Sequence, residues 1–131
     1  MYSDKVLDHF LNPRNVGQLL DPDGIGQVGD PSCGDCLRIY IKVKNNRIDE
    51  ICFVALGCPA AIATSSAFTE LVKNKTLGEA LEITDSEVVS SLGGVPDLKV
   101  HCSTLGTEAL RRAVKDYLER QGKKRVTKSS R

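Results

Sequence analysis

Residues 35–56 constrain the fold most, because apolar and polar side chains alternate along two stretches that a short polar turn separates. The stretches 35–44 and 48–56 both have the period of half-buried strands. Asn45-Asn46-Arg47 suits a hairpin loop between them, since asparagine tolerates positive φ. One face of the hairpin is expected to point to the core, and its members are Leu37, Ile39, Ile41, Val43, Ile51, Phe53 and Ala55. Cys36 and Cys52 fall on the other face.

Helical patterns lie on both sides of this hairpin. The expected elements are a helix over 4–12 with Val6, Leu7, Phe10 and Leu11 on its apolar side, a short strand near 25–29, a helix over 59–73, two short helices that begin at the capping boxes Thr76/Glu79 and Thr84/Glu87, and a last helix over about 103–120. Strands followed by helices indicate an α+β fold, an antiparallel sheet covered on one face by helices. His9 falls outside the apolar side of the first helix, so we expect a solvated or locally bonded histidine.

Length and composition point to one domain. The chain has 131 residues, of which 40% are apolar, enough for a single core. No apolar run approaches the roughly 20 residues of a membrane span, and the first residues lack the regions of a signal peptide. We therefore expect a soluble, cytoplasmic protein without membrane association. In that reducing setting the 5 cysteines are ligands, nucleophiles or buried small residues rather than disulfide partners.

The charge is uneven along the chain. Six of the 18 basic residues lie within 120–131, where no acidic residue occurs. Such a composition is typical of a disordered end, so we expect a domain over 1–120 and a disordered basic tail over 121–131. The alternative is a basic arm for an acidic partner. Nucleic acid is not the expected partner, because no aromatic residue interleaves the tail.

Three cysteine positions stand beside residues that suit metal chemistry. The segments are Cys33-Gly34-Asp35, Gly57-Cys58 and His101-Cys102. A structural zinc site normally closes four positions with Cys and His, whereas three thiolates plus an oxygen or nitrogen donor leave one position weak. Cys58 and Cys102 each precede a predicted helix, whose positive N-terminal end favours thiolate over thiol. The pattern indicates a metal or iron–sulfur site assembled from separated segments.

Three other interpretations stay open. Cys33-Gly34-Asp35-Cys36 is a C-x-x-C motif, but a thiol oxidoreductase needs both sulfurs at a helix start, and here the pair precedes a strand that places Cys33 and Cys36 on opposite sides. A second interpretation is a zinc-binding sulfur acceptor or a structural zinc module held by the same residues. The third is an interaction domain whose cysteines are packing residues, which fits Cys36 and Cys52 better than the other three.

Several segments together are typical of one family. They are Tyr2-Ser3-Asp4-Lys5-Val6, Asn12-Pro13-Arg14-Asn15-Val16-Gly17, Cys33-Gly34-Asp35, Gly57-Cys58 with Ala61-Ile62-Ala63-Thr64-Ser65-Ser66, and Lys99-Val100-His101-Cys102-Ser103. Over residues 1 to about 120 the chain resembles the iron–sulfur cluster scaffold family, which comprises IscU and the N-terminal domain of NifU. The resemblance implies a three-stranded antiparallel sheet with helices packed on it.

The resemblance also implies a function. Such a protein is a scaffold or carrier rather than an enzyme. It accepts sulfur as a persulfide from a cysteine desulfurase, takes iron from an iron donor or frataxin-like protein, and assembles a transient [2Fe–2S] cluster for apo-protein recipients. Zinc is a further candidate metal, as a stand-in for iron in the cluster-free form, and the sequence leaves the oligomeric state open, with a homodimer as one candidate.

By the same resemblance, the cluster thiolates are Cys33, Cys58 and Cys102. Asp35 is implied as a labile ligand or regulator and His101 as the alternative fourth ligand. Cys102 is the implied persulfide acceptor, and Lys99 is implied to pair with Asp35 or Cys102 when metal is absent.

The chain departs from the family pattern at two places. Val95-Pro96-Asp97-Leu98-Lys99 stands where the IscU branch has a Leu-Pro-Pro-Val-Lys chaperone-binding sequence, so handover through a dedicated Hsp70-type chaperone is not expected. Pro59-Ala60 replaces the usual Gly-Ser after the second cysteine, which predicts a stiffer backbone there. The short interval between Ser66 and His101 does not indicate the insertion of the SufU relatives.

Overall fold

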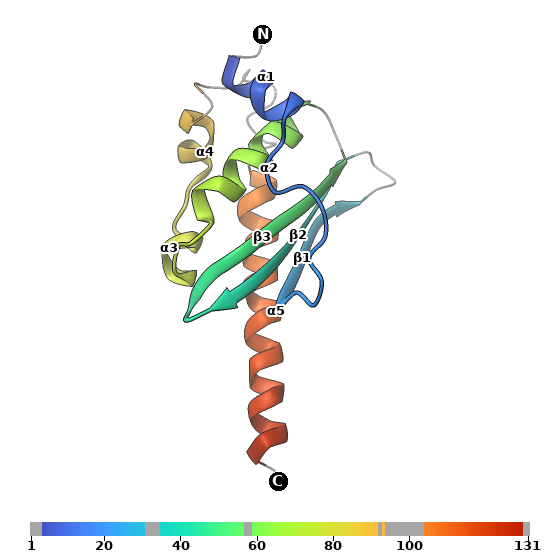
Figure 1. Cartoon of the computed structure of the whole chain (residues 1–131), viewed down its shortest axis with the longest axis vertical. Coiled ribbons are helices and arrows are strands. Elements are labelled where there is room, and N and C mark those ends of the chain that lie inside the picture. The colour runs from blue at the N-terminus through green and yellow to red at the C-terminus, as the bar shows by residue number, and fades with distance from the viewer. Residues whose placement is uncertain (1–3, 31–34, 57–58, 92, 94–103, 130–131) are drawn as a thin grey trace.

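The computed structural model describes residues 4–30, 35–56, 59–91, 93 and 104–129, and its elements follow the expected order (Figure 1). They are α1 (Asp4–Leu11), β1 (Gly24–Asp30), β2 (Asp35–Lys44), β3 (Arg47–Leu56), α2 (Pro59–Val72), α3 (Leu77–Leu81), α4 (Asp85–Ser91) and α5 (Thr104–Ser129). The strands form one antiparallel sheet in the order β1-β2-β3. The expected α+β class and three-stranded sheet are confirmed.

The β2–β3 hairpin turns through two residues. Lys44 pairs with Arg47, so Arg47 belongs to the return strand and the loop is shorter than expected. Asn45 and Asn46 have φ of 54° and 63°, the left-handed conformation that asparagine adopts more readily than most residues. This turn sets the register that places Leu37, Ile39 and Ile41 on one face, where all three are fully buried.

The core lies between that face and the helices. α5 packs along β1 and β2, and α2 packs against β3 and contacts α5 (Figure 1). Close packing of α5 needs the glycines of β1, because a Cβ at Gly24 or Gly26 would collide with backbone atoms of Ala113 or Ala109. The described helices therefore cover one face of the sheet, as the sequence predicted.

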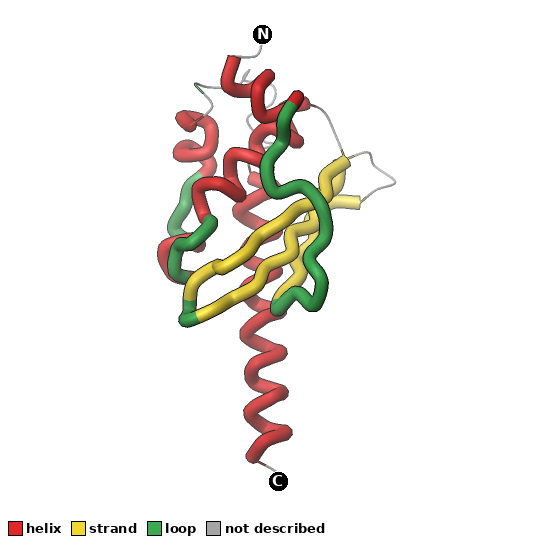
Figure 2. The backbone as a smooth tube through the Cα atoms, viewed as in Figure 1, coloured by secondary structure: helices red, strands yellow, loops and turns green. Residues whose placement is uncertain are grey.

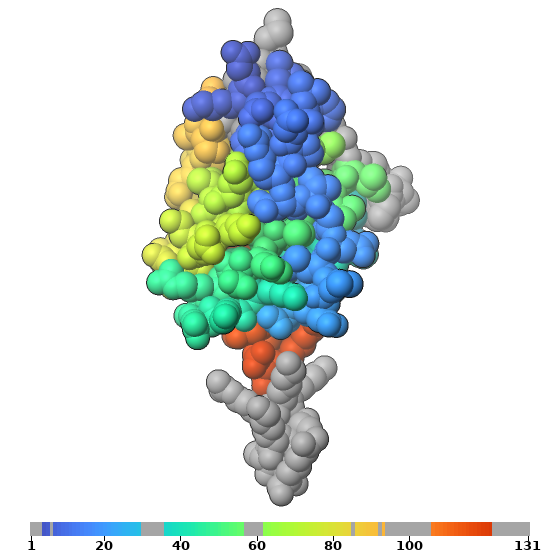
Figure 3. Space-filling model, in the orientation of Figure 1, coloured from blue at the N-terminus to red at the C-terminus, as the bar shows by residue number. Residues whose placement is uncertain are grey.

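A long connection crosses the opposite face. Residues 12–23 start beside the outer edge of β3, where Phe53 N–H donates to Asn15 O and Gly17 N–H donates to Phe53 O, both at 2.8 Å. They end beside β2, where Asp23 N–H donates to Ile41 O at 2.8 Å. Figures 2 and 3 show this segment running over the strands. Cys36 and Tyr40 lie on this face and are buried, 8% and 5% exposed.

Two helices differ from expectation. α5 continues to Ser129, so the predicted helix end near Arg120 is wrong; good helix formers such as Lys123 and Lys124 follow, and no proline interrupts them. The division between a domain and a disordered tail stays a prediction. The predicted apolar side of α1 is only partly covered, because Leu7 and Leu11 remain 41% and 70% exposed.

The short helices start as predicted. Thr76 and Glu79 form a reciprocal capping box at α3. At α4 the Thr84 hydroxyl accepts the Glu87 N–H at 3.2 Å. Within the described residues, no helix is both long and apolar enough to span a bilayer.

Candidate metal centre

Most of the predicted ligands lie outside the described residues. These are Cys33, Cys58, His101 and Cys102, together with Lys99. Asp35 is described through its backbone and is the first residue of β2. The part of the site that can be placed is therefore its frame, the strand ends and helix starts that flank the three predicted segments.

Two of these segments directly follow a strand of the sheet. Asp30 pairs with Asp35 on either side of residues 31–34, and Cys36 pairs with Leu56 in the neighbouring ladder. In the sequence Cys58 follows Leu56 by two residues and directly precedes Pro59, the first residue of α2. The segments that contain Cys33 and Cys58 are thus anchored at the same end of the sheet.

The start of α5 points to that end too. Gly24 of β1 faces Ala113 and Tyr117 of α5, whereas Gly26, further along β1, faces Ala109. Earlier residues of α5 therefore lie beside later residues of β1, and the helix start at Thr104 is directed toward Asp30. His101 and Cys102 come three and two residues before this start in the sequence. The frame therefore brings at least one described flank of each of the three segments to one region of the molecule.

The frame also has an electrostatic consequence. α2 and α5 both begin in this region, and the first N–H groups of a helix lack partners within it and carry partial positive charge. Anionic groups are favoured beside such ends. The prediction that Cys58 and Cys102 are thiolates stays a prediction, supported by the confirmed helix starts at Pro59 and Thr104.

The remaining cysteines lie on the face away from the helices. Cys36 lines a small cavity of about 210 Å³ with Gln18 and Tyr40. Cys52 pairs with Tyr40 across the sheet and is half-buried. Burial, followed by the nearby Glu50 carboxylate, raises the pKa of the Cys52 thiol. Both thiols are free and sit where the alternation predicted, which supports leaving them out of the ligand set.

A polar contact between α1 and α2 was missed from the sequence. Nδ1 of His9 lies 2.8 Å from the hydroxyl of Ser66, which also accepts the Arg14 N–H at 2.9 Å. The amide of Asn15 donates to the Thr69 hydroxyl at 3.0 Å. His9 was expected to be solvated or locally bonded, and its partner 57 residues away shows that this was wrong.

A signal for this contact was present in the sequence. Thr64, Ser65, Ser66 and Thr69 all lie in α2 and are at most 3% exposed. Buried hydroxyls in a helix need partners, so such a run predicts contacts with another polar segment.

Within the described residues, no group of three or more His, Cys, Asp or Glu side chains is close enough to hold a metal ion.

Known proteins resemble this chain over nearly its whole length. The family model described as the NifU-like N-terminal domain matches residues 1–124. The iron-sulfur cluster assembly scaffold protein IscU 1 of Archaeoglobus fulgidus is 60% identical over 123 residues, which cover 94% of this chain and 80% of that protein. The protein named IscU of Azotobacter vinelandii is 47% identical over 125 residues, with coverage of 92% and 97%.

Solved structures share the fold. The N-terminal part of a NifU-like protein from Brucella abortus superposes with a TM-score of 0.70 at 18% identity, covering 89% of this chain and 94% of that one. A SUF-system scaffold protein from Fervidobacterium islandicum, itself described as putative, gives 0.69 at 20% identity, covering 86% and 95%. At these identities the likeness concerns the fold alone.

Proposed function

Because this chain belongs to the family of NifU-like N-terminal domains, we propose that it is an assembly scaffold for iron–sulfur clusters. The observation that carries the proposal is that the described residues directly beside the three cysteine segments lie toward one end of the sheet. Asp30 and Asp35 bracket the first segment, Leu56 and Pro59 the second, and Thr104 follows the third. Each of these segments contains one of the three cysteines beside Gly, Asp or His.

The donor set suits a cluster that is handed on. Cys33, Cys58 and Cys102 would supply three soft thiolates, the preferred ligands of iron–sulfur clusters. The fourth ligand would be the carboxylate of Asp35 or the imidazole of His101, both of which bind iron in a cluster less firmly than a thiolate. One weak position lets a recipient's thiolate displace a ligand without breaking the whole site. A [2Fe–2S] cluster is the cargo that such a set holds.

Sulfur would arrive through Cys102. Its thiolate attacks the outer sulfur of a persulfide on the cysteine desulfurase, the sulfur–sulfur bond of the donor breaks, and the desulfurase thiolate leaves. Cys102 then carries the persulfide. Release of that sulfur as sulfide takes two further electrons, which a dithiol reductant or an electron-transfer protein must supply. The start of α5 after residue 103 supports this role, because a helix N-terminus stabilises the attacking thiolate.

Reconstitution tests the proposal. The full chain is incubated anaerobically with iron(II), cysteine, a dithiol reductant and a cysteine desulfurase, and iron, sulfide and the absorption spectrum are measured. We expect the spectrum of a [2Fe–2S] cluster with equal amounts of iron and sulfide. Cys33→Ala, Cys58→Ala and Cys102→Ala should each prevent stable assembly, whereas Cys52→Ser is the matched control and should not. A chain that takes up zinc but never iron and sulfide would be a zinc module instead.

A further inference from the structure

A groove between α3 and α5 lies apart from the candidate metal centre. Its volume is about 480 Å³, and its lining residues are Leu81, Arg111, Val114, Lys115, Leu118 and Glu119. Arg111 is seven residues beyond Thr104, a helical distance of about 10 Å at 1.5 Å per residue. The groove therefore runs along the part of α5 that leads away from the cluster end.

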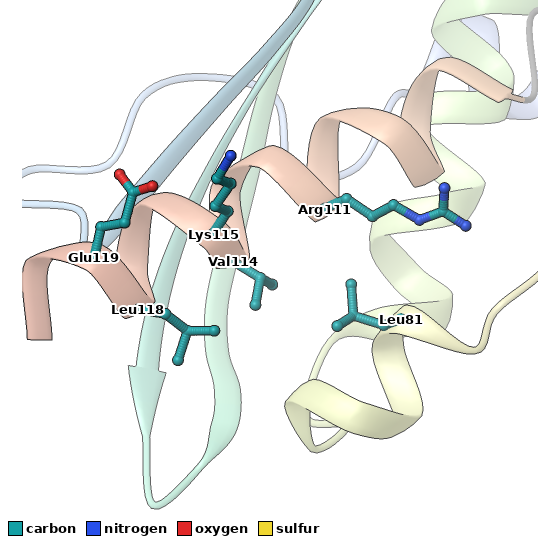
Figure 4. A pocket seen from close by; sticks show the side chains of 6 residues that line it. All are labelled: Leu81, Arg111, Val114, Lys115, Leu118 and Glu119. Atoms are coloured by element: carbon teal, nitrogen blue, oxygen red, sulfur yellow. The ribbon is translucent and has the colours of Figure 1, made fainter. Parts of the chain in front are cut away.

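The groove has an apolar floor and two exposed apolar side chains beside it. Val114 is 4% exposed and forms the floor, whereas Leu81 and Leu118 are 38% and 56% exposed. Figure 4 shows Val114 and Leu118 directed to the side on which Leu81 lies. Two large apolar side chains that remain open on either side of one hollow are a feature of surfaces that bind other molecules.

The length of the groove suits a helix. Arg111 and Leu118 are seven residues apart on α5, which is two helical turns or about 10 Å. A partner helix that presents apolar side chains at i, i+3 or i+4, and i+7 has the same apolar length. Such side chains would contact Leu81, Val114 and Leu118 together.

The charges along the groove select the partner. Arg111 and Lys115 both line it, and among the described residues Lys115 forms no ion pair, while Arg111 has only a 3.7 Å contact with Glu108. Glu119 is the one acidic lining residue. Beyond it the backbone of α5 continues to Ser129 through a sequence with four more basic residues in the helix after Arg120 and no acidic one. We propose that this groove docks an acidic amphipathic helix of a partner protein, with leucine-like side chains over Leu81 and Leu118 and carboxylates beside Arg111 and Lys115.

A designed peptide tests this. The probe is a fluorescein-labelled helix of about four turns, with leucines at i, i+4 and i+7 and glutamates at the flanking positions, and fluorescence anisotropy measures its binding to the full chain. A second peptide carries lysine in place of every glutamate. We expect the acidic peptide to bind and the basic peptide not to bind.

Variants locate the site. Leu118→Ser and Lys115→Glu should each weaken the acidic peptide about tenfold, the effect of losing a central contact. Lys115→Glu should also bind the basic peptide better than the unmodified chain does. The matched controls are Leu20→Ser, at a leucine that is 87% exposed on the other face of the sheet, and Lys44→Glu in the hairpin. Both should bind like the unmodified chain, and circular dichroism confirms that every variant is folded.

Several outcomes would overturn the proposal. The acidic peptide could fail to bind the unmodified chain, or bind folded Leu118→Ser and Lys115→Glu equally well. A short DNA duplex that binds and displaces the peptide would make this a nucleic-acid surface. Self-association in sedimentation that Leu118→Ser abolishes would make the occupant a second copy of the chain.

Discussion

Nδ1 of His9 lies 2.8 Å from the hydroxyl oxygen of Ser66, which joins the first helix to the middle of α2. The same hydroxyl accepts the backbone N–H of Arg14 at 2.9 Å, so its own proton is available for His9. The second ring nitrogen of His9 faces Glu70 at 3.5 Å. A single fully buried hydroxyl thus fixes both α1 and the start of the connection that crosses the sheet.

Ser66→Ala should therefore destabilise the protein. The change leaves the Arg14 N–H and the His9 ring without their partner, and a buried polar group that loses its partner costs about 1–3 kcal/mol. Denaturant unfolding measures this loss. Ser90→Ala, at an exposed position of α4, is the control and should change the stability little. Equal stability of the two variants would show that the contact contributes nothing to the fold.

Stability should also fall in mildly acidic solution because of His9. Burial lowers the pKa of His9 below the ordinary value of 6.5, with a further lowering by the charge of Arg14, and these outweigh Glu70 and Asp8, which raise it. Between the two pKa values, His9 is therefore protonated in the unfolded chain but still neutral in the folded protein. The contribution of neutral His9 to the free energy of unfolding is fully present above pH 6.5 and is lost as the pH falls through the lower pKa of the folded state.

The measurement is the free energy of unfolding between pH 8 and 5, compared for the unmodified chain and His9→Gln. We expect the unmodified chain to lose more stability on acidification than the variant. Identical slopes would exclude His9 as the group responsible, and NMR titration of the ring would report its pKa directly.

The sheet was predictable because its signal is local. Alternation from Leu37 to Ile41 and the pair Asn45-Asn46 specify strand, turn and buried face within a few residues of each other. The capping boxes at Thr76 and Thr84 are local in the same way. The candidate ligands, too, were found from local neighbours, since each cysteine stands beside Gly, Asp or His at an element boundary.

What the sequence did not predict depends on distant partners. His9 and Ser66 are far apart in the chain, and neither position belongs to a periodic pattern that would connect them. The path of residues 12–23 across the sheet was not predictable either, because turn-forming residues break any period there. The end of α5 was misplaced because the basic run without acidic residues was interpreted as a disordered tail, whereas most of the run consists of helix formers.

Gly26→Ala should loosen the packing of α5 on β1. A methyl group there would collide with the carbonyl oxygen of Ala109 and the backbone nitrogen of Ala113, so strand and helix must separate, at a cost of about 1–3 kcal/mol or more. Gly78→Ala is the control, and we expect it to raise the free energy of unfolding rather than lower it. Nothing lies within 4 Å of a Cβ at Gly78, and alanine favours the helix. A Gly26→Ala variant as stable as the unmodified chain would contradict this packing.

Cys36 should be dispensable for cluster assembly. It lies on the sheet face opposite the helices and is 8% exposed, so its thiol is directed away from the side on which α2 and α5 begin. Cys36→Ala should therefore take up iron and sulfide like the unmodified chain in the reconstitution, and the chain should not reduce disulfides as a dithiol enzyme would. Loss of assembly in folded Cys36→Ala would make Cys36 a ligand.

Asp35 should make the cluster easier to release. It begins β2 at the end of the sheet that also holds Asp30 and Leu56 and toward which the start of α5 is directed. A carboxylate is a hard, exchangeable donor that keeps a polar corner on an iron–sulfur site, so its removal should lower access of water and allow the neutral nitrogen of His101 to take the vacant position. Asp35→Ala should then hold its cluster longer in air and transfer it more slowly to an apo-ferredoxin. Asp49→Ala, at an exposed position of β3, is the control for removing one carboxylate and should match the unmodified chain in both rates. If Asp35→Ala loses its cluster faster than this control, Asp35 is a holding ligand rather than a release element.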